Sequence, residues 1–151
     1  GNDQTMLQTE LVAARYSSNS GQTLTRATNA IVVFEDIDYD NFNAYNSSTG
    51  EYTIPVSGKY DIDAQIKWAS IALTTSVTIT LEIFVNGVVG SVIFHASGDA
   101  SLTRAYGNGG SDTLDLVKGD VVTIRAYQDS ASDDQLTTIN TDNHFSIVRQ
   151  K

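Results

Sequence analysis

The sequence has no cysteine, which excludes disulfide bonds, thiol catalysis and zinc sites built from cysteine. Basic residues are also scarce, because 9 lysines and arginines stand against 18 acids and give a net charge of −9. Such a surface repels phosphate backbones and anionic headgroups, so we expect no nucleic-acid partner. No apolar run approaches the roughly 20 residues needed to cross a bilayer, so we also expect no membrane insertion.

Residues 1–10 lack the basic start and apolar centre of a signal peptide. We expect them to form a leader or tail, with Gly1 as a scar of tag removal. Residues 11–151 contain no internal repeat, linker or low-complexity segment, so they are expected to form one domain. A chain of this length can bury a two-layer core without disulfides or metal.

The strongest local pattern is an alternation of apolar and polar residues, which in a strand sends successive side chains to opposite faces. It is unbroken from residue 59 to 68, where one face collects Tyr60, Ile62, Ala64, Ile66 and Trp68. A second such run places on one face Val77, Ile79, Leu81, Ile83 and Val85. That run ends at Asn86-Gly87, a preferred type I′ turn, and the sequence therefore predicts an antiparallel hairpin across 77–95.

Other short runs with strand character are separated by turn-forming residues. They cover Ala13–Tyr16, Ala30–Phe34, Gly50–Ile54, Ser101–Tyr106, Thr113–Val117, Val121–Tyr127 and His144–Arg149. About ten short strands at this spacing predict an all-β fold, a two-sheet antiparallel jelly-roll sandwich.

Several motifs resemble the C1q-like domains of the C1q/TNF-like superfamily. The family's Gly-x-(Phe/Tyr) strand, Pro-x-x-Gly turn and Tyr-led long strand are matched by Gly50, Tyr52, Pro55, Gly58 and Tyr60. Three further motifs follow the family's order: Asp40-Asn41-Phe42, Leu114–Val122 and His144–Val148. The resemblance covers roughly residues 12–150. More narrowly, Ala13–Tyr16 and Val33–Asp36 resemble C1q-like domains of bacteriophage structural proteins.

The resemblance implies a ten-stranded jelly roll that packs as a homotrimer and contacts its partner through exposed loops at one end. Four aromatic residues near strand ends could bury against a neighbouring subunit, with ordinary core or edge packing as the alternative: Tyr16, Tyr106, Tyr127 and Phe145. The chain departs from the animal C1q pattern because it lacks a collagen-like stalk and has Asp61 and Asp63 where aromatics are usual. Both departures argue against an animal complement-type or hormone-type role.

Motifs that would carry catalysis are missing, and we predict that the chain is not an enzyme. There is no Gly-x-Ser-x-Gly elbow, and neither His95 nor His144 has a partner at metal-site spacing. The glycines of 107–110 precede no Lys-(Ser/Thr) pair and no helix, which favours an inter-strand turn over a phosphate loop. Glycosidase chemistry needs two carboxylates across a cleft, and a small sandwich with one tryptophan offers little cleft.

Acidic residues at alternate positions raise the question of a metal. Asp36, Asp38 and Asp40 have the 1, 3, 5 spacing of a calcium loop, but Asn41 and Ser47 stand where an EF-hand has Gly and Glu. We expect no cofactor, with calcium as the alternative at these three residues. Alternating Asp can equally be a solvated strand face or an edge protected from aggregation.

The function predicted from these observations is attachment of a phage tail, fibre or other virion protein to a host-surface glycan or protein. Polar loops rich in Asn, Asp, Thr and Tyr suit sugar hydroxyls, and the candidate ligand-binding residues are Tyr106, Asn108, Asp129, Asp133 and Asp134. Two alternatives remain open: a virion domain that only trimerises or decorates, and a secreted module that binds protein or carbohydrate. The expected location is the virion surface or the extracellular space.

Overall fold

A computed structural model describes residues 11–98 and 102–151, which form thirteen strands and no helix. The predicted all-β sandwich is therefore confirmed, with several extra strands of only two residues. The leader at 1–10 and the start of the strand expected at 101–106 lie outside the described residues. Nothing in the described part of the chain forms a helix that could span a membrane.

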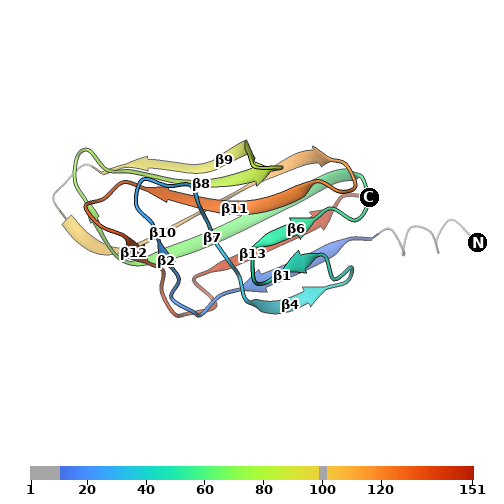
Figure 1. Cartoon of the computed structure of the whole chain (residues 1–151), viewed down its shortest axis with the longest axis horizontal. Coiled ribbons are helices and arrows are strands. Elements are labelled where there is room, and N and C mark those ends of the chain that lie inside the picture. Colours follow the sequence, from blue (N-terminus) through green and yellow to red (C-terminus); the bar gives the residue numbers. More distant parts are fainter. Residues whose placement is uncertain (1–10, 99–101) are drawn as a thin grey trace, which may run out of the picture.

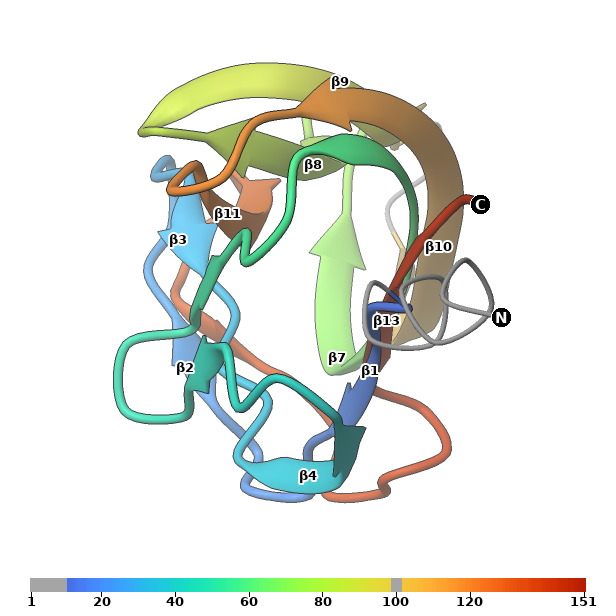
Figure 2. The same cartoon turned by 90° about the vertical axis from the view of Figure 1, so that its right-hand side faces the viewer.

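Two antiparallel sheets face each other across the core (Figures 1 and 2). The first sheet contains, in order, β10 (Leu102–Leu116), β7 (Gly58–Leu73), β13 (His144–Arg149), β1 (Ala13–Ser17) and β4 (Asp36–Asp40). The second contains β5 (Tyr45–Asn46), β6 (Glu51–Thr53), β11 (Val121–Gln128), β8 (Thr78–Val85) and β9 (Val88–Ser97), with β3 (Ala30–Ile31) paired to β11. A small third sheet joins β12 (Asp134–Gln135) to β2 (Thr23–Leu24).

The alternation read in the sequence sets which faces meet in the core. On β7 all five residues of the apolar face, from Tyr60 to Trp68, are fully buried, while the alternate positions Lys59, Asp61 and Asp63 are exposed. On β8 the inward residues Ile79, Leu81 and Ile83 are likewise buried, and Val85 is partly buried. Burying a large apolar side chain contributes about 1.5–3 kcal/mol, so these two strands supply much of the stability of the sandwich.

The predicted hairpin is confirmed. Strands β8 and β9 pair antiparallel through the two-residue turn at Asn86-Gly87. Both turn residues have positive φ, 52° for Asn86 and 79° for Gly87, as a type I′ turn requires.

The turn expected at 107–110 is wrong, because this segment lies inside the long strand β10. Gly109 and Gly110 pair with Gln65 and Ala64 of β7, and pairing continues on both sides of them. The glycines serve close approach, since a Cβ on Gly110 would collide with the carbonyl oxygen of Ile93 on β9. The free edges of the two sheets thus meet at β9 and β10.

The two ends of the described domain lie together at one end of the sandwich (Figure 1). The Arg149 backbone N–H donates to the Val12 carbonyl oxygen at 2.9 Å, and that of Gln150 donates to the carbonyl of Lys59 at 2.7 Å. The opposite end is formed by loops and by the small β2–β12 sheet, and we call it the loop end.

Candidate functional site

A groove of about 380 Å³ opens at the loop end. One wall is the segment after β1, the other is the segment after β12, and Ala69 of β7 contributes to the lining. The full lining is Ser20, Gly21, Ala69, Gln135, Leu136, Thr137, Thr138 and Ile139. These side chains offer hydroxyl and amide groups beside a few apolar surfaces and carry no formal charge, a mixture that suits a neutral, hydroxyl-rich ligand.

Buried Asn143 holds the second wall of the groove in place. Its Oδ1 accepts the Lys67 backbone N–H at 2.9 Å, and its Nδ2 donates to the carbonyl oxygens of Thr137 at 3.1 Å and of Ile139 at 3.3 Å. The side chain is fully buried, so the 137–143 segment is fixed before any ligand arrives. The sequence signal for this role was only an Asn at the end of a polar loop.

Glu35 holds the first wall. Its two carboxylate oxygens accept the Ser18 hydroxyl at 2.8 Å and the Asn19 backbone N–H at 2.9 Å. The Ser18 backbone N–H also donates to the carbonyl oxygen of Asn143, at 3.0 Å, which ties the two walls together. The groove is therefore a built feature of the fold rather than a gap between loose loops.

A second, smaller hollow of about 140 Å³ lies where β9 and β10 approach β7 and β8. It is lined by Leu73, Ile79, Ala96, Ser97, Gly98, Arg104 and Tyr106. The Arg104 guanidinium lies 5.5 Å from the centre of the Tyr106 ring, and that ring also meets Phe94 edge-on at 6.2 Å. Tyr106, one of the predicted ligand residues, thus lines a hollow, whereas Asn108 is buried farther along the same strand.

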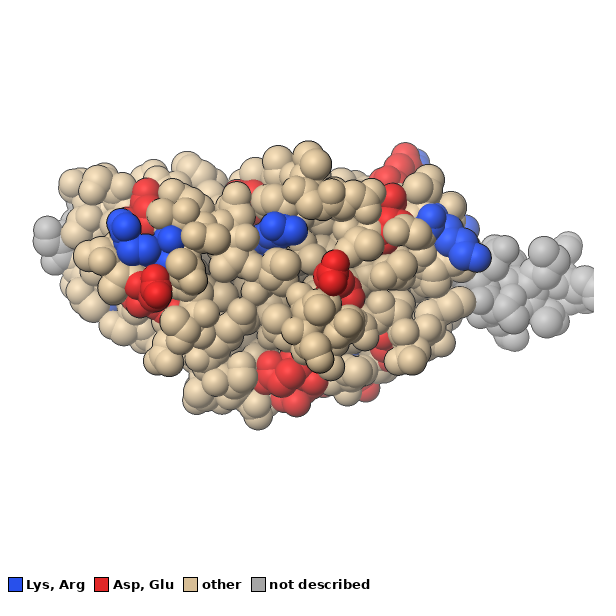
Figure 3. Space-filling view, viewed as in Figure 1, with Lys and Arg blue, Asp and Glu red and all other residues tan. Residues whose placement is uncertain are grey.

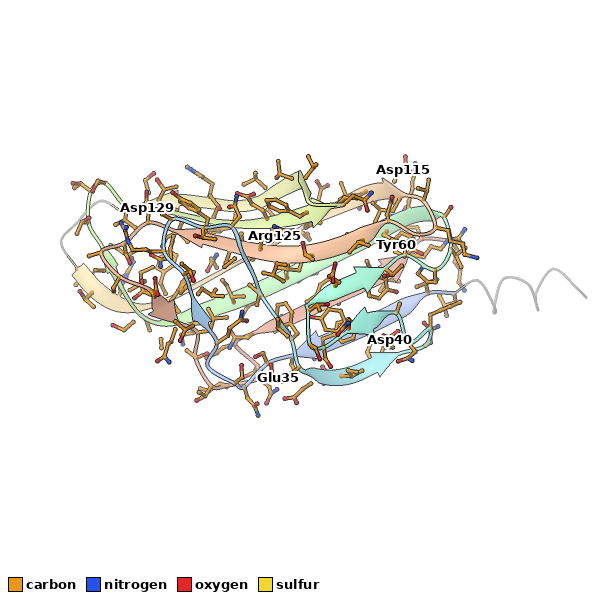
Figure 4. The ribbon with its side chains drawn as sticks, in the orientation of Figure 1. Glu35, Asp40, Tyr60, Asp115, Arg125 and Asp129 are labelled. Atoms are coloured by element: carbon orange, nitrogen blue, oxygen red, sulfur yellow. The ribbon has the colours of Figure 1, made fainter. Side chains whose placement is uncertain are left out.

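The three acids predicted to bind a ligand are each used to fix loop backbone or a neighbouring hydroxyl. Asp129 accepts the Thr78 backbone N–H at 2.6 Å, Asp133 accepts the Arg26 backbone N–H at 3.0 Å, and Asp134 accepts the Ser130 hydroxyl at 2.6 Å. None of the three lines the groove or the hollow of Tyr106. Their binding role stays a prediction, and their visible role is to shape the loop end, where Asp129 lies (Figure 4).

The candidate calcium ligands on β4 also have separate partners. Asp36 accepts the Asn140 side-chain amide at 2.8 Å, Asp38 pairs with Arg15, and Asp40 accepts the Tyr16 hydroxyl at 2.8 Å. Within residues 11–98 and 102–151, no group of three metal-ligating side chains converges. The structure favours the reading of β4 as a strand edge whose acids are held by hydrogen bonds.

Two of the aromatics expected at a subunit interface lie inside the subunit instead, and the structure corrects that expectation. Tyr16 is fully buried and Phe145 is 1% exposed, with ring centres 5.5 Å apart. Tyr16 also stacks on Tyr45 at 4.2 Å. Burial, together with the neighbouring Asp40 carboxylate, raises the pKa of Tyr16, and burial raises the pKa of Tyr45 to about 12. Tyr106 and Tyr127, by contrast, are partly exposed.

The fold and the ordered motifs agree with a comparison against protein families, in which the C1q domain matches residues 14–146. This chain belongs to the C1q domain family. The match covers both sheets of the sandwich and the loop end.

Individual proteins are also similar to this chain. The uncharacterized protein YqcC of Bacillus subtilis (strain 168) is 25% identical over 126 residues, which cover 82% of this C1q domain chain and 34% of the relative. The chain thus spans about a third of the length of that protein. Among solved structures, the globular domain of zebrafish complement 1qA is similar with a TM-score of 0.65 and 17% identity, covering 94% of this chain and 98% of the other. Eiger TNF from S. frugiperda has a TM-score of 0.65 at 13% identity over 93% of each chain, and murine APRIL at pH 8.0 has 0.63 at 10% identity over 93% and 100%. These likenesses show the shared fold.

The C1q domain also presents the outward face of its first sheet to solvent. Charges of both signs lie along β7 on this face, where Asp61 and Asp63 stand between Lys59 and Lys67. Half-buried His144 lies beside them on β13, and burial, followed by the Arg15 charge, lowers its pKa. On the side of the molecule shown in Figure 3, acidic and basic residues are likewise interspersed and form no basic patch.

Proposed function

We propose that this C1q domain is a non-enzymatic homotrimeric module that attaches its parent protein to a partner outside the cell. The observation that carries the proposal is the position of the groove, at the end of the sandwich opposite the hydrogen bond between Val12 and Arg149. A parent chain joined at those residues leaves the loop end free to meet a partner. The fixed walls of the groove favour binding, because a preformed site loses little entropy when it is filled.

Trimer formation is supported by two surfaces of the first sheet. Its outward face carries both Lys and Asp on β7, which a second copy of the same chain could complement by charge. At the edge of the same sheet, β4 and the turn after it expose three large apolar side chains: Ile37 at 50%, Tyr39 at 49% and Phe42 at 36%. Apolar groups gathered in this way on a small domain are typical of a contact surface.

The ligand proposed for the groove is a glycan on a host surface. The Thr138 and Ser20 hydroxyls and the Gln135 amide can donate and accept, as sugar hydroxyls require, and Ile139 offers an apolar contact. Three weak sites on one trimer would gain avidity by acting together. Placement in a phage tail or fibre rests on the resemblance of Ala13–Tyr16 and Val33–Asp36 to phage C1q-like domains.

Light scattering and a glycan array test the proposal. We expect a trimer at micromolar concentration, and binding to arrayed glycans that Ile139→Arg removes because the new side chain fills the groove. Val117→Arg is the matched control, because Val117 is 60% exposed, against 54% for Ile139, and lies in the turn after β10, outside the groove lining. A monomer, or equal loss of binding in both variants, would contradict the proposal.

A purely structural role is the second candidate, favoured by the exposed apolar side chains of β4. In that case the domain only trimerises or decorates a virion. Deletion of the domain from its parent particle separates the two roles: intact particles that no longer adsorb support attachment, and failed assembly supports the structural role.

A further inference from the structure

Three side chains of β10, those of Arg104, Tyr106 and Asn108, form a line from the surface into the space between the sheets. Tyr106 and Asn108 pair with Trp68 and Ile66 of β7, both fully buried, so they share the inward face of the first sheet. Burial increases along this line, because Arg104 is exposed, Tyr106 is half-buried and Asn108 is 4% exposed. The chain therefore places a cation, an aromatic ring and an amide in sequence from rim to interior.

The inner end of this line holds polar groups without partners. Among the residues that the structure describes, neither amide atom of Asn108 has a hydrogen-bond partner, and the same is true of the Trp68 indole Nε1. The two residues occupy diagonal positions on paired strands, which brings their side chains within reach of one small molecule. Buried polar groups are nearly always hydrogen-bonded, because leaving one unpaired is costly. Two such groups side by side, one of them an Asn, indicate a site that a polar molecule completes.

The hollow beside Tyr106 lies on the same line. Its volume of about 140 Å³ suits a molecule no larger than a monosaccharide. The Arg104 guanidinium, a donor, lies in the lining of the hollow. Two further donors, the Trp68 indole N–H and the Asn108 amide NH₂, are buried deeper on the same line, outside the lining. No carboxylate in the described ranges pairs with Arg104, so its donors remain available to a ligand. A donor-rich site of this kind favours a ligand rich in acceptors.

We propose that the hollow binds a small hydroxycarboxylate, the class that includes acidic monosaccharides. Arg104 holds the carboxylate at the rim, Tyr106 covers the ligand, and Asn108 with the Trp68 Nε1 hydrogen-bonds its hydroxyl groups inside. Tyr106 contacts Phe94 and Arg104 through its ring and packs on the margin of the hydrophobic core. No hydrogen bond holds its hydroxyl within the described part of the chain, and a ligand reaches Asn108 when the ring turns aside. The site shares no lining residue with the groove and does not depend on the attachment function.

Fluorescence offers a direct test, because Trp68 is the single tryptophan of the chain. Glucuronate, as the probe, should change the Trp68 emission in a saturable way, while glucose at the same concentrations should give little change. Arg104→Gln removes a charged hydrogen bond and should weaken glucuronate binding about 10- to 100-fold. Lys118→Gln removes an exposed charge at the other end of the domain, away from the hollow, and should leave binding unchanged.

Asn108→Leu gives the second, independent result. The variant should lose glucuronate binding and melt at a higher temperature than the wild type, because a buried unpaired amide is replaced by an apolar group of similar size. Calorimetry measures binding in every variant without relying on fluorescence. The proposal is overturned if the wild type binds no glucuronate, or if binding survives both Arg104→Gln and Asn108→Leu.

Discussion

The hydrogen bond between Tyr16 and Asp40 should couple the core to the edge strand β4, and a double-mutant cycle can measure that coupling. The Tyr16 hydroxyl donates to Asp40 Oδ2 at 2.8 Å. The same carboxylate accepts the backbone N–H groups of Phe42, Ala44 and Tyr45 at 3.3, 2.9 and 3.2 Å. One carboxylate therefore fixes both a buried phenol and the turn that follows β4.

The magnitudes follow from these contacts. Tyr16→Phe keeps the ring stacking but loses a hydrogen bond to a charged group, which should reduce the free energy of unfolding by about 1.5–3 kcal/mol. Asp40→Ala removes all four hydrogen bonds and leaves a fully buried hydroxyl without a partner, so we expect a loss of about 3–5 kcal/mol. Because both variants delete the same bond, their effects should fall short of additivity by about 1–2 kcal/mol.

Urea unfolding at pH 7 and one fixed protein concentration measures all four species of the cycle. A fixed concentration is needed because association would otherwise contribute to apparent stability. The reasoning is refuted if the two effects are additive, or if Tyr16→Phe changes the oligomeric state at unchanged stability. The latter result would mean that Tyr16 serves a subunit contact after all.

Three further predictions concern single positions. Gly110→Ala should lower the free energy of unfolding in urea by about 3 kcal/mol, because the new methyl group meets a β9 carbonyl oxygen. Gly107→Ala, whose new Cβ would lie 3.8 Å from its nearest neighbour, should change it by less than about 0.5 kcal/mol. Equal effects would contradict the close packing of β9 on β10. Folding lowers the pKa of His144 below its ordinary 6.5, so the unfolded chain binds more protons than the folded chain. The stability of the fold should therefore fall as the pH drops below 6.5. Thermal melting across this pH range should show that His144→Gln removes this part of the pH dependence. Asn86→Ala loses two side-chain hydrogen bonds at 2.9 Å and places alanine at positive φ, for a loss of about 1–2 kcal/mol, and an unchanged melting temperature would show that the turn residue is dispensable.

The sequence was sufficient for the sandwich because alternation is a local property that the sheet simply preserves. Every second residue from Tyr60 to Trp68 is buried as predicted, and Asn86-Gly87 forms the predicted turn. It was not sufficient for the segment 107–110, because glycines that turn a chain and glycines that let two strands touch look the same. Only the partner strand, Gly58–Leu73, shows that they lie flat inside β10.

The candidate site was harder to predict, because side-chain partners come from distant parts of the chain. Tyr16 and Asp40 are 24 residues apart and share a hydrogen bond. From the sequence, Tyr16 was a candidate for a subunit interface and Asp40 a candidate calcium ligand. Asn143 was overlooked because its three partners lie on two segments, one of them 76 residues away. Residue type indicates what a side chain can bind, whereas the long-range register decides what it does bind.

The backbone hydrogen bond between Val12 and Arg149 has a practical consequence for engineering. Ends that lie this close can be joined by a short linker, so the domain is suited to circular permutation. New ends opened at the exposed Asn86-Gly87 turn would interrupt neither sheet. The whole domain could equally be inserted into a surface loop of another protein, which would then carry the groove on its outside.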